Sequence, residues 1–506
     1  MKIKLYLTCV LVAIFGSIGF SQHWCGTHHT EEFMERLEAN VKYASTHEVR
    51  SPDFKYIPIV FHLVADDDGE GRMNEESVML QLCRLNNQYI DVGLQYYIES
   101  FNYINNSDMF NHVAPNVQGG MNANRVDGVL NFYILASTHN PNVAGYYTIG
   151  IDVLVVRKDH FLEEDNITSG HEIGHLLSLA HPHVGWEDEP YTPAQYGETV
   201  IITSISSVQA SALVEIMDDP NCLNTGDRIC DTPPDYGFTQ NGGNSSTCNN
   251  PWEGIVKDRN GVLIESIPNY IMGYNACNNN IFSEQQMDAM NADYISRINM
   301  GTSQTRYMKS GYTPDLSTIT EAPSLNYPAI AETVETYNSI LFDWEPVPNA
   351  HSYIVVIGGG TDLRIPVDTD ELFVSQLEAN TTYSWKVVPL NEIGYCVELI
   401  NSNLFFTGNS TSSTNEIEEV NSFQVYPNPT QGATQLKVAM EVEKDVEMKL
   451  NILSMDGKLI QSIGTQRFLS GNSIQTISID NLSDGIYFIK AESSSGTVIK
   501  RFVVNK

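Results

Sequence analysis

The segment GHEIGHLLSLAHPH, residues 170–183, constrains this chain more than any other part of its sequence. His171 and His175 are four residues apart, so on a helix they share one face and can bind the same metal ion. Glu172 follows the first histidine, where it can take a proton from a metal-bound water. His181 can supply a third nitrogen if the helix ends before it. Three neutral imidazoles leave one position open for water, which is typical of a catalytic zinc site.

A surface helix with two incidental histidines is the alternative explanation of a short HExxH string. The third histidine at this spacing favours the zinc site. We expect His183 to lie beside the ligands or at the surface rather than on the metal.

The segment resembles the long zinc motif of metzincin metalloproteases, and its apolar filling resembles that of the pappalysin family. NYIMGY (269–274) resembles the Met-turn of that family, and GDRICDTPPD (226–235) and NACNNNIFSEQQ (275–286) also match it. The resemblance implies a zinc endopeptidase acting on extracellular proteins or peptides, with zinc-bound water activated by Glu172. It also implies that Met272 lies under the ligands and that Tyr274 stabilises the tetrahedral intermediate. Without the zinc motif, ordinary core packing would explain Met272.

The sequence departs from the family pattern at Ser178, where the family usually has glycine. That glycine lets the chain turn toward the third ligand, often with positive φ. Serine there costs about 1 kcal/mol, too little to abolish a site held by zinc.

Substrate binding is predicted from two further features. A strand expected at residues 151–156 would align an extended peptide by edge pairing. The family resemblance implies a preference for a basic residue after the scissile bond, for which Asp288 or Asp293 could supply the acidic pocket. A solvated helix face explains these two carboxylates equally well.

The cysteines point to an oxidising compartment. Of eight in the chain, Cys9 falls in a predicted leader, so an odd number remains and at least one stays unpaired. Four cluster near the Met-turn and allow three pairings: Cys222, Cys230, Cys248 and Cys277. The pappalysin resemblance implies Cys222–Cys248 and Cys230–Cys277.

The same region offers oxygen donors in Asp227, Asp231 and Thr232. The resemblance implies that they bind calcium. Turn formation is the alternative, since Asp-Thr-Pro-Pro is also a turn sequence.

The string Cys25-Gly26-Thr27 resembles the start of pappalysin pro-segments. A thiolate at Cys25 could occupy the open zinc position and keep a zymogen inactive. Release would follow cleavage of the segment near Arg50. A Cys25–Cys83 disulfide is the alternative, and Cys396 has no evident partner.

Residues 1–21 have the basic start, apolar run and small residues of a secretory signal peptide. No later stretch is long and apolar enough for a transmembrane segment. The chain carries 62 acidic and 28 basic residues, a formal net charge of −34. This balance argues against nucleic acid as a partner, because phosphates would be repelled, and is compatible with calcium sites.

The remaining patterns predict the order of domains. Strands at 56–63, 94–101, 129–135 and 151–156 with a helix at 75–89 predict one α/β or α+β domain over 53–312, after a pro-segment at 22–52. Residues 316–408 resemble a fibronectin type III domain, with Trp344 and Tyr353 buried and Leu377 and Tyr383 at its tyrosine corner. Residues 409–422 have the polar composition of a linker.

The last segment, 423–506, contains VYPNPTQG and LSDGIYFIKA, and hairpin signals at Asp456-Gly457 and Asp484-Gly485. These strings resemble the sorting domain of the type IX secretion system of Bacteroidetes. The resemblance implies signal-peptide export, recognition by the type IX machinery, and a secreted or cell-surface location. A generic carbohydrate-binding β-sandwich is the alternative.

Two functions fit these features: a secreted zinc endopeptidase, or a catalytically inactive surface adhesin on a protease scaffold. The intact histidine trio with Glu172, Met272 and Tyr274 favours the first. The predicted fold class is an α+β metzincin-like zinc protease domain, with a twisted sheet and an active-site helix, followed by two all-β sandwich domains.

Overall fold

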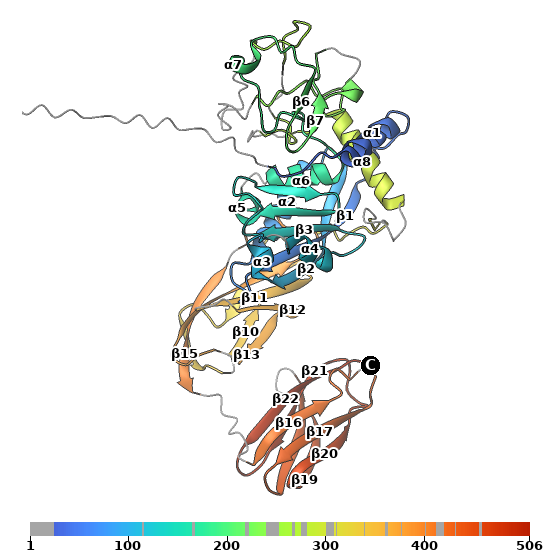
Figure 1. Ribbon diagram of the computed structural model, residues 1–506. Coiled ribbons are helices and arrows are strands. Elements are labelled where there is room, and N and C mark those ends of the chain that lie inside the picture. Colours follow the sequence, from blue (N-terminus) through green and yellow to red (C-terminus); the bar gives the residue numbers. More distant parts are fainter. Residues whose placement is uncertain are drawn as a thin grey trace, which may run out of the picture.

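The computed structural model describes residues 25–506 with interruptions (Figure 1). The interruptions are residues 114–115, 164–166, 218–221, 239–251, 253, 266–268, 275–280, 300–307, 310, 339, 360–362, 376, 400, 411–418, 431 and 455–457. The predicted signal peptide, Cys248, Cys277, most of the predicted linker and the turn at Asp456–Gly457 therefore lie outside the described residues.

A five-stranded sheet forms the framework of the first domain, in the order β2-β1-β3-β5-β4. Its strands are β1 (Lys55–Ala65), β2 (Leu94–Asn105), β3 (Leu130–Leu135), β4 (Gly145–Thr148) and β5 (Val153–Arg157). All pair in parallel except β4, which runs antiparallel to β5. Since β5 lies between β3 and β4, the prediction that residues 151–156 form the substrate-binding edge is wrong. The edge strand is β4, which is too short for a period-2 pattern to identify.

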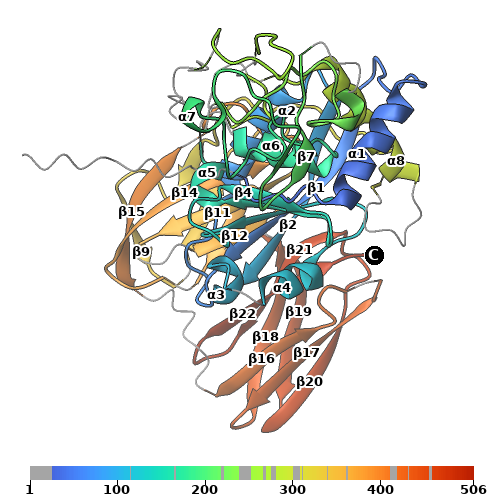
Figure 2. The same ribbon diagram turned by 45° about the horizontal axis from the view of Figure 1, so that its top comes forward.

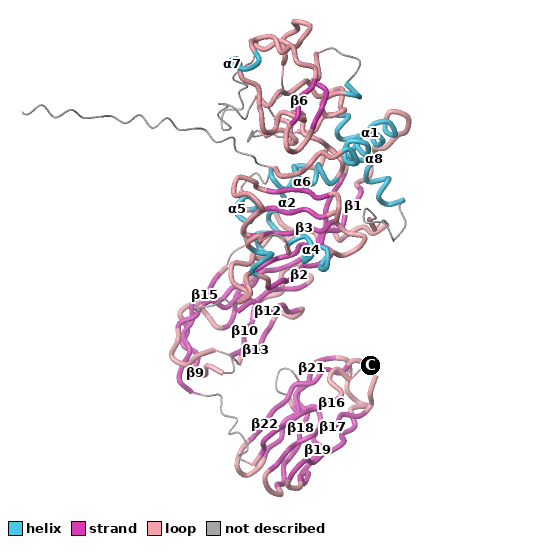
Figure 3. Tube along the Cα trace, viewed as in Figure 1, coloured by secondary structure: helices cyan, strands magenta, loops and turns pink. Residues whose placement is uncertain are grey.

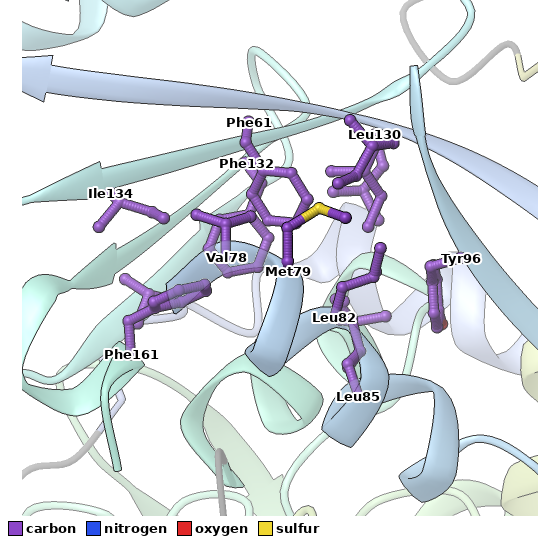
Figure 4. Packing of buried hydrophobic residues seen from close by; sticks show 14 of the residues in the cluster. Phe61, Val78, Met79, Leu82, Leu85, Tyr96, Leu130, Phe132, Ile134 and Phe161 are labelled. Atoms are coloured by element: carbon purple, nitrogen blue, oxygen red, sulfur yellow. The ribbon is translucent and has the colours of Figure 1, made fainter. Parts of the chain in front are cut away.

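Helix α2 (Glu75–Gln88) covers one face of this sheet. It begins where the Asn74 side chain accepts a hydrogen bond from the Ser77 amide at 2.8 Å, an N-cap. Figure 4 shows its apolar side chains, Met79 among them, packed against Phe132 and neighbouring sheet residues. Burial of this face by the hydrophobic effect fixes the helix on the sheet.

Two further helices lie side by side at one edge of the domain (Figure 2): α1 (Glu31–Ala44), in the predicted pro-segment, and α8 (Glu284–Asn299). The remaining described elements are α3 (Ser107–Phe110), α4 (Val117–Asn124), α5 (Lys158–Phe161), α6 (Ile167–Leu176), α7 (Pro193–Tyr196), β6 (Ser204–Ser206), β7 (Ser211–Leu213) and the 3₁₀ turn η1 (Cys222–Asn224). Most of the described residues between α6 and α8 form irregular loops (Figure 3).

The second domain is a β-sandwich. One sheet has the order β13-β10-β8 and the other β12-β11-β14-β15-β9. The strands are β8 (Leu325–Tyr327), β9 (Glu332–Thr336), β10 (Ile340–Trp344), β11 (Ser352–Gly358), β12 (Leu363–Val367), β13 (Glu371–Val374), β14 (Thr382–Leu390) and β15 (Ser402–Ser410). Trp344 and Tyr353 are buried, as predicted. The Tyr383 hydroxyl accepts a hydrogen bond from the Glu378 amide at 2.9 Å, which confirms the tyrosine corner.

The sandwich is fixed to the first domain. A disulfide joins Cys83 of α2 to Cys396, so the alternative Cys25–Cys83 pairing is wrong. Arg364 and Lys386 form ion pairs with two glutamates at the start of α2. One continuous hydrophobic cluster also runs through both domains.

The last seven strands form another sandwich, with sheets ordered β16-β17-β20 and β19-β18-β21-β22 and a hydrophobic cluster of its own. They are β16 (Val420–Tyr426), β17 (Gln435–Val442), β18 (Val446–Ser454), β19 (Leu459–Phe468), β20 (Gly471–Ser478), β21 (Gly485–Glu492) and β22 (Thr497–Val504). The hairpin predicted at Asp484-Gly485 is wrong, because β20 and β21 belong to different sheets and this dipeptide only introduces β21. None of the helices in the described parts of the chain is long and apolar enough to span a membrane.

Candidate functional site

Helix α6 carries the first two histidines and is buried along its whole length. It ends in a Schellman motif, with the Leu179 amide bonded to the Gly174 carbonyl and the Ser178 amide to that of His175, each at 2.9 Å. Ser178 takes the left-handed position of this motif with φ 75°, where glycine is usual. Its hydroxyl accepts a hydrogen bond from Asn40 of α1 at 2.8 Å. The turn sends the chain back to His181.

The three predicted ligands converge on one point. The Nε2 atom of His175 lies 3.0 Å from the Nε2 atoms of His171 and His181, and those two are 3.1 Å apart. All three side chains are buried. Three nitrogens so close to one another match ligands that share one ion at about 2.0–2.1 Å.

The Nδ1 atoms of the three histidines each face an oxygen acceptor, which suits rings that bind a metal through Nε2. The Nδ1 atom of His171 lies 2.8 Å from the Ile271 carbonyl, and that of His175 lies 2.7 Å from the Leu179 carbonyl. His181 Nδ1 faces a Glu187 carboxylate oxygen at 3.4 Å. These acceptors favour a proton on Nδ1 and leave Nε2 with a free lone pair. Burial lowers the pKa of His171 to about 4, so this ring is neutral at neutral pH.

Glu172 lies beside the three imidazoles, fully buried, on the side of β4. Burial raises the pKa of its carboxyl to about 8, although hydrogen bonds with Cys25 and Thr27 act in the opposite direction. A cavity of about 20 Å³ between His171, Glu172 and Tyr274 has the size of one water molecule. A carboxyl with a pKa near neutrality at such a position can act as a general base.

Met272 lies directly against helix α6. A Cβ added to Gly174, between the two helical histidines, would overlap the Met272 sulfur. The Met272 side chain is fully buried and belongs to the main hydrophobic cluster. The predicted platform under the ligands is therefore also part of the core.

Tyr274 stands at the edge of the histidine cluster, as predicted. Its ring centroid lies 4.8 Å from that of His181 and 4.4 Å from that of His183. His183 stacks on His181 at 4.8 Å and is buried, so of the two predicted locations it takes the one beside the ligands.

Cys25, in the predicted pro-segment, lies against the histidine cluster. Its Sγ atom lies 3.3 Å from His175 Nε2, and the thiol with the three histidines forms a group of donor atoms able to hold one ion. Burial and the nearby Glu172 charge raise the pKa of the Cys25 thiol. A cation at the cluster would remove that proton, because coordinating thiols are deprotonated.

Hydrogen bonds hold the Cys25 segment between strand β4 and the β6–β7 turn. On one side, the Gly26 amide donates to the Gly145 carbonyl of β4 at 2.9 Å, in a parallel bridge. On the other, Gln209, in the β6–β7 turn, donates from its side chain to the Cys25 carbonyl and accepts from the His29 amide, both at 2.9 Å. Thr27 donates to Glu172 at 3.1 Å.

Four residues of the site were not predicted from the sequence: Thr27, His29, Glu187 and Gln209. His29 packs edge-on against His181 and faces Glu187 at 3.5 Å, so the predicted pro-segment shares a carboxylate with the third predicted ligand. None of these residues belongs to a sequence motif with a recognisable spacing. The only available signal was the string that follows Cys25.

The two candidate pocket carboxylates have different surroundings. Asp288 pairs with Arg50 at the surface. Asp293 is buried and pairs with Arg297 at 2.8 Å and with Arg36 of α1 at 2.5 Å. Burial alone would raise the pKa of Asp293, but the two guanidinium groups hold it at about 2. The alternative of a solvated helix face is therefore wrong for Asp293.

The predicted disulfides of this region are wrong. Cys222 pairs with Cys230, eight residues later, rather than with Cys248, and Cys230 is thereby excluded as the partner of Cys277. The observed Cys222–Cys230 bond belongs to one of the three pairings that the sequence alone had allowed.

Asp227, Asp231 and Thr232 lie together, but hydrogen bonds engage their oxygens. Thr232 donates to Asp227 at 3.0 Å, and Asp231 accepts from the Gln285 amide in the first turn of α8 at 2.9 Å. Burial raises the pKa of Asp227 to about 7. These bonds match the predicted turn alternative, and calcium binding stays a prediction.

Comparisons with known proteins give the following similarities. Residues 424–505 match the family of secretion system C-terminal sorting domains. None of the curated proteins matches the chain. A solved structure of a mutant of Tannerella forsythia promirolysin is 14% identical, with 54% of this chain and 94% of that one covered and a TM-score of 0.35. The fibronectin type III domain of human collagen alpha-1(XX) is 16% identical over 20% of this chain and 98% of its own, with a TM-score of 0.15. The chain thus ends in a secretion sorting domain.

Proposed function

We propose that this chain is a secreted zinc endopeptidase, made as a zymogen, that hydrolyses peptide bonds in extracellular proteins or peptides. The observation that carries the proposal is the convergence of three Nε2 atoms beside a buried carboxyl. Structural zinc sites use four protein ligands, whereas three histidines leave a position for reacting groups.

His171, His175 and His181 would hold the zinc. When bound, it would polarise the scissile carbonyl and lower the pKa of the attacking water. Glu172 takes the proton of that water and delivers it to the leaving amine, the usual work of a general base that then acts as an acid. The Tyr274 hydroxyl, beside the cluster, donates to the oxyanion of the tetrahedral intermediate.

Latency follows from the same contacts. The Cys25 thiolate would be the fourth ligand, and Thr27 ties up Glu172 with a hydrogen bond. The segment pairs with β4 in parallel, and β4 would align an extended substrate once the segment leaves. Arg50 is partly exposed in its ion pairs with Glu284 and Asp288, and cleavage there would release α1.

The sorting domain supports export through the type IX machinery and a location outside the cell or on its surface. The alternative function, an inactive adhesin on a protease scaffold, predicts decay of the catalytic groups. The described site keeps all of them, which favours the peptidase.

Casein cleavage by the full chain, cut after Arg50 with trypsin that is then inhibited, tests the proposal beside a Glu172→Ala variant treated in the same way. We expect cleavage that chelation abolishes, and a loss of about 10²–10⁴-fold in the variant. The full chain is needed because Cys83–Cys396 and a shared core join the first two domains. Zinc binding without cleavage in the trypsin-treated chain would support the adhesin instead.

A further inference from the structure

A second cavity, of about 310 Å³, lies on the other side of the Cys25 segment from the histidine cluster. Its lining includes His28, His112, Gln118, His139, Tyr146 and Thr148. This volume falls in the range of small-ligand sites, about 300–1,000 Å³. The cavity shares no lining residue with the water-sized cavity between His171, Glu172 and Tyr274.

The chemistry of this cavity is unusual for so acidic a chain. Its described lining contains three imidazoles and no carboxylate, although the chain carries a net charge of −34. His112 Nε2 lies 2.7 Å from the Tyr146 hydroxyl, while its Nδ1 atom is buried without a hydrogen-bond partner among the described residues. His112 also has a φ of 55°, a strained backbone state that favours a functional role.

The pro-segment shows how a peptide in the cleft would reach this cavity. Cys25 directs its side chain to the histidine cluster, and Gly26 is the next residue. Side chains of an extended chain alternate between faces, so the residue after the one at the metal points away from it. A Cβ built on Gly26 would lie 2.7 Å from His139 Cε1, 3.1 Å from Val143 Cγ1 and 3.4 Å from Tyr146 Cβ, so the His139 ring would have to shift to admit it. A side chain at this position would therefore press on the wall of the cavity and enter it beside His139.

We propose that this cavity is a substrate subsite that accepts an acidic side chain, Asp or Glu, from the residue next to the one facing the metal. This proposal rests on the proposed function and names the class of its substrate. His28 and Gly26 leave with the pro-segment, whereas His112, His139 and Tyr146 remain. Hydrogen bonds from their N–H and O–H groups to a carboxylate are charge-assisted and stronger than those to an amide.

The cavity can be tested in the intact chain, without catalysis. Gly26→Glu places a carboxylate in it and Gly26→Gln an amide of the same shape. We expect the Glu variant to unfold at a temperature about 2–4 °C higher than the Gln variant, and this difference to vanish in a His139→Gln background. Equal unfolding temperatures, or a difference that persists in His139→Gln, would overturn the proposal. Because no cleavage is measured, failure here is separate from failure of the proposed function.

Matched peptides test the same subsite in the trypsin-treated chain carrying Glu172→Ala, by calorimetric binding. At one position next to the scissile bond, Glu should bind about 10- to 100-fold more tightly than Gln. His112→Asn, which tolerates the same φ, and His139→Gln should each remove most of this preference. His351→Gln, an exposed histidine of the second domain, should leave it unchanged. Peptides that bind with no preference for Glu at any position, or a preference that both variants keep, would overturn the subsite while leaving the peptidase assignment to the casein assay.

Discussion

The buried cluster has two walls of different origin. Helix α6 and the turn to His181 form one wall, within the fifteen residues 167–181. The Cys25 segment forms the other, 150 residues from His175 along the chain. The first wall supplies the three predicted zinc ligands and Glu172, and Tyr274 joins them from a later loop. The second wall covers those groups and continues into a stretch that ends near a partly exposed arginine.

This difference shows that a site can contain all its reacting groups and still be closed to substrate. Ligand geometry in the first wall is fixed by helix periodicity and a Schellman turn. Closure by the second wall depends on contacts that cleavage can remove: one thiol, a few main-chain bonds and helix α1. Changes in the first wall should alter metal binding and chemistry in every form, and changes in the second only in the intact chain.

The largest expected effect is on zinc affinity in the first wall. His181→Ala removes a ligand and should weaken zinc binding by more than about 100-fold, the upper range for changes in groups that only orient a ligand. Glu187→Gln, which weakens only the acceptor of His181 Nδ1, should cost about 10- to 100-fold. His183→Ala is the matched control. Competition with a chromophoric chelator measures all three, and equal losses in the His181 and His183 variants would contradict the ligand assignment.

The next effect concerns the ion-pair network under both walls. Arg297→Ala leaves the buried carboxylates Asp152 and Asp293 underneutralised and should destabilise the chain by about 3–5 kcal/mol. Arg36→Ala should destabilise only the intact chain, because α1 is absent after cleavage. Arg467→Ala, which breaks an exposed ion pair with Asp445 in the sorting domain, is the control and should leave the stability nearly unchanged.

The same network sets an acid limit. Asp293 has a folded pKa of about 2, below an unfolded value of about 3.9. Its contribution to stability is therefore complete above about pH 4 and is lost as the pH falls toward 2. Urea unfolding of wild type and Asp293→Asn between pH 5 and 2 should show the two curves converge in acid. A constant difference over that range would contradict this assignment.

A smaller effect is expected for Cys25→Ala, which opens the second wall. Each 1.4 kcal/mol of lost affinity between the segment and the site should raise the peptidase activity of the intact chain about tenfold. After cleavage at Arg50 the variant and wild type should be indistinguishable. A rise that persists after cleavage would mean that Cys25 does not act through closure.

The smallest effect tests packing in the first wall. Gly174→Ala presses a methyl group on the Met272 sulfur and should cost about 1–3 kcal/mol. Gly119→Ala in α4 meets open space and should stabilise by about 0.5–1 kcal/mol. Thermal unfolding of the two variants measures the contrast. A stable Gly174→Ala would show that Met272 does not pack on the active-site helix.

The sequence predicted those parts of the site that lie within short motifs, among them Met272 and Tyr274 in NYIMGY (269–274). His171, His175 and Glu172 follow from helix periodicity, and Cys25 from a short string. Only tertiary folding brings the predicted ligands together with Glu187, His29 and Gln209. No sequence spacing therefore predicts these three residues. The strands show the same difference: β1 was evident from the pattern at residues 56–63, whereas the four-residue edge strand β4 was not predicted.

The disulfides show the same limit. The four cysteines near the Met-turn allowed three pairings, and the one that the family resemblance implied is wrong, because Cys222 is joined to Cys230. Cys83 and Cys396 are 313 residues apart, and only the docking of the second domain on α2 brings them together. Contacts between domains leave no periodic trace in a single sequence.

X-ray absorption at the zinc edge, on the zinc-loaded full chain before and after cleavage at Arg50, tests the central claim most directly. For the intact chain we predict three nitrogen ligands at about 2.0–2.1 Å and one sulfur at about 2.3 Å. After cleavage the sulfur should be replaced by an oxygen at about 2.0–2.2 Å while the nitrogens remain. Absence of sulfur in the intact chain would contradict closure by Cys25, and failure to bind one zinc per chain would contradict the metal site itself.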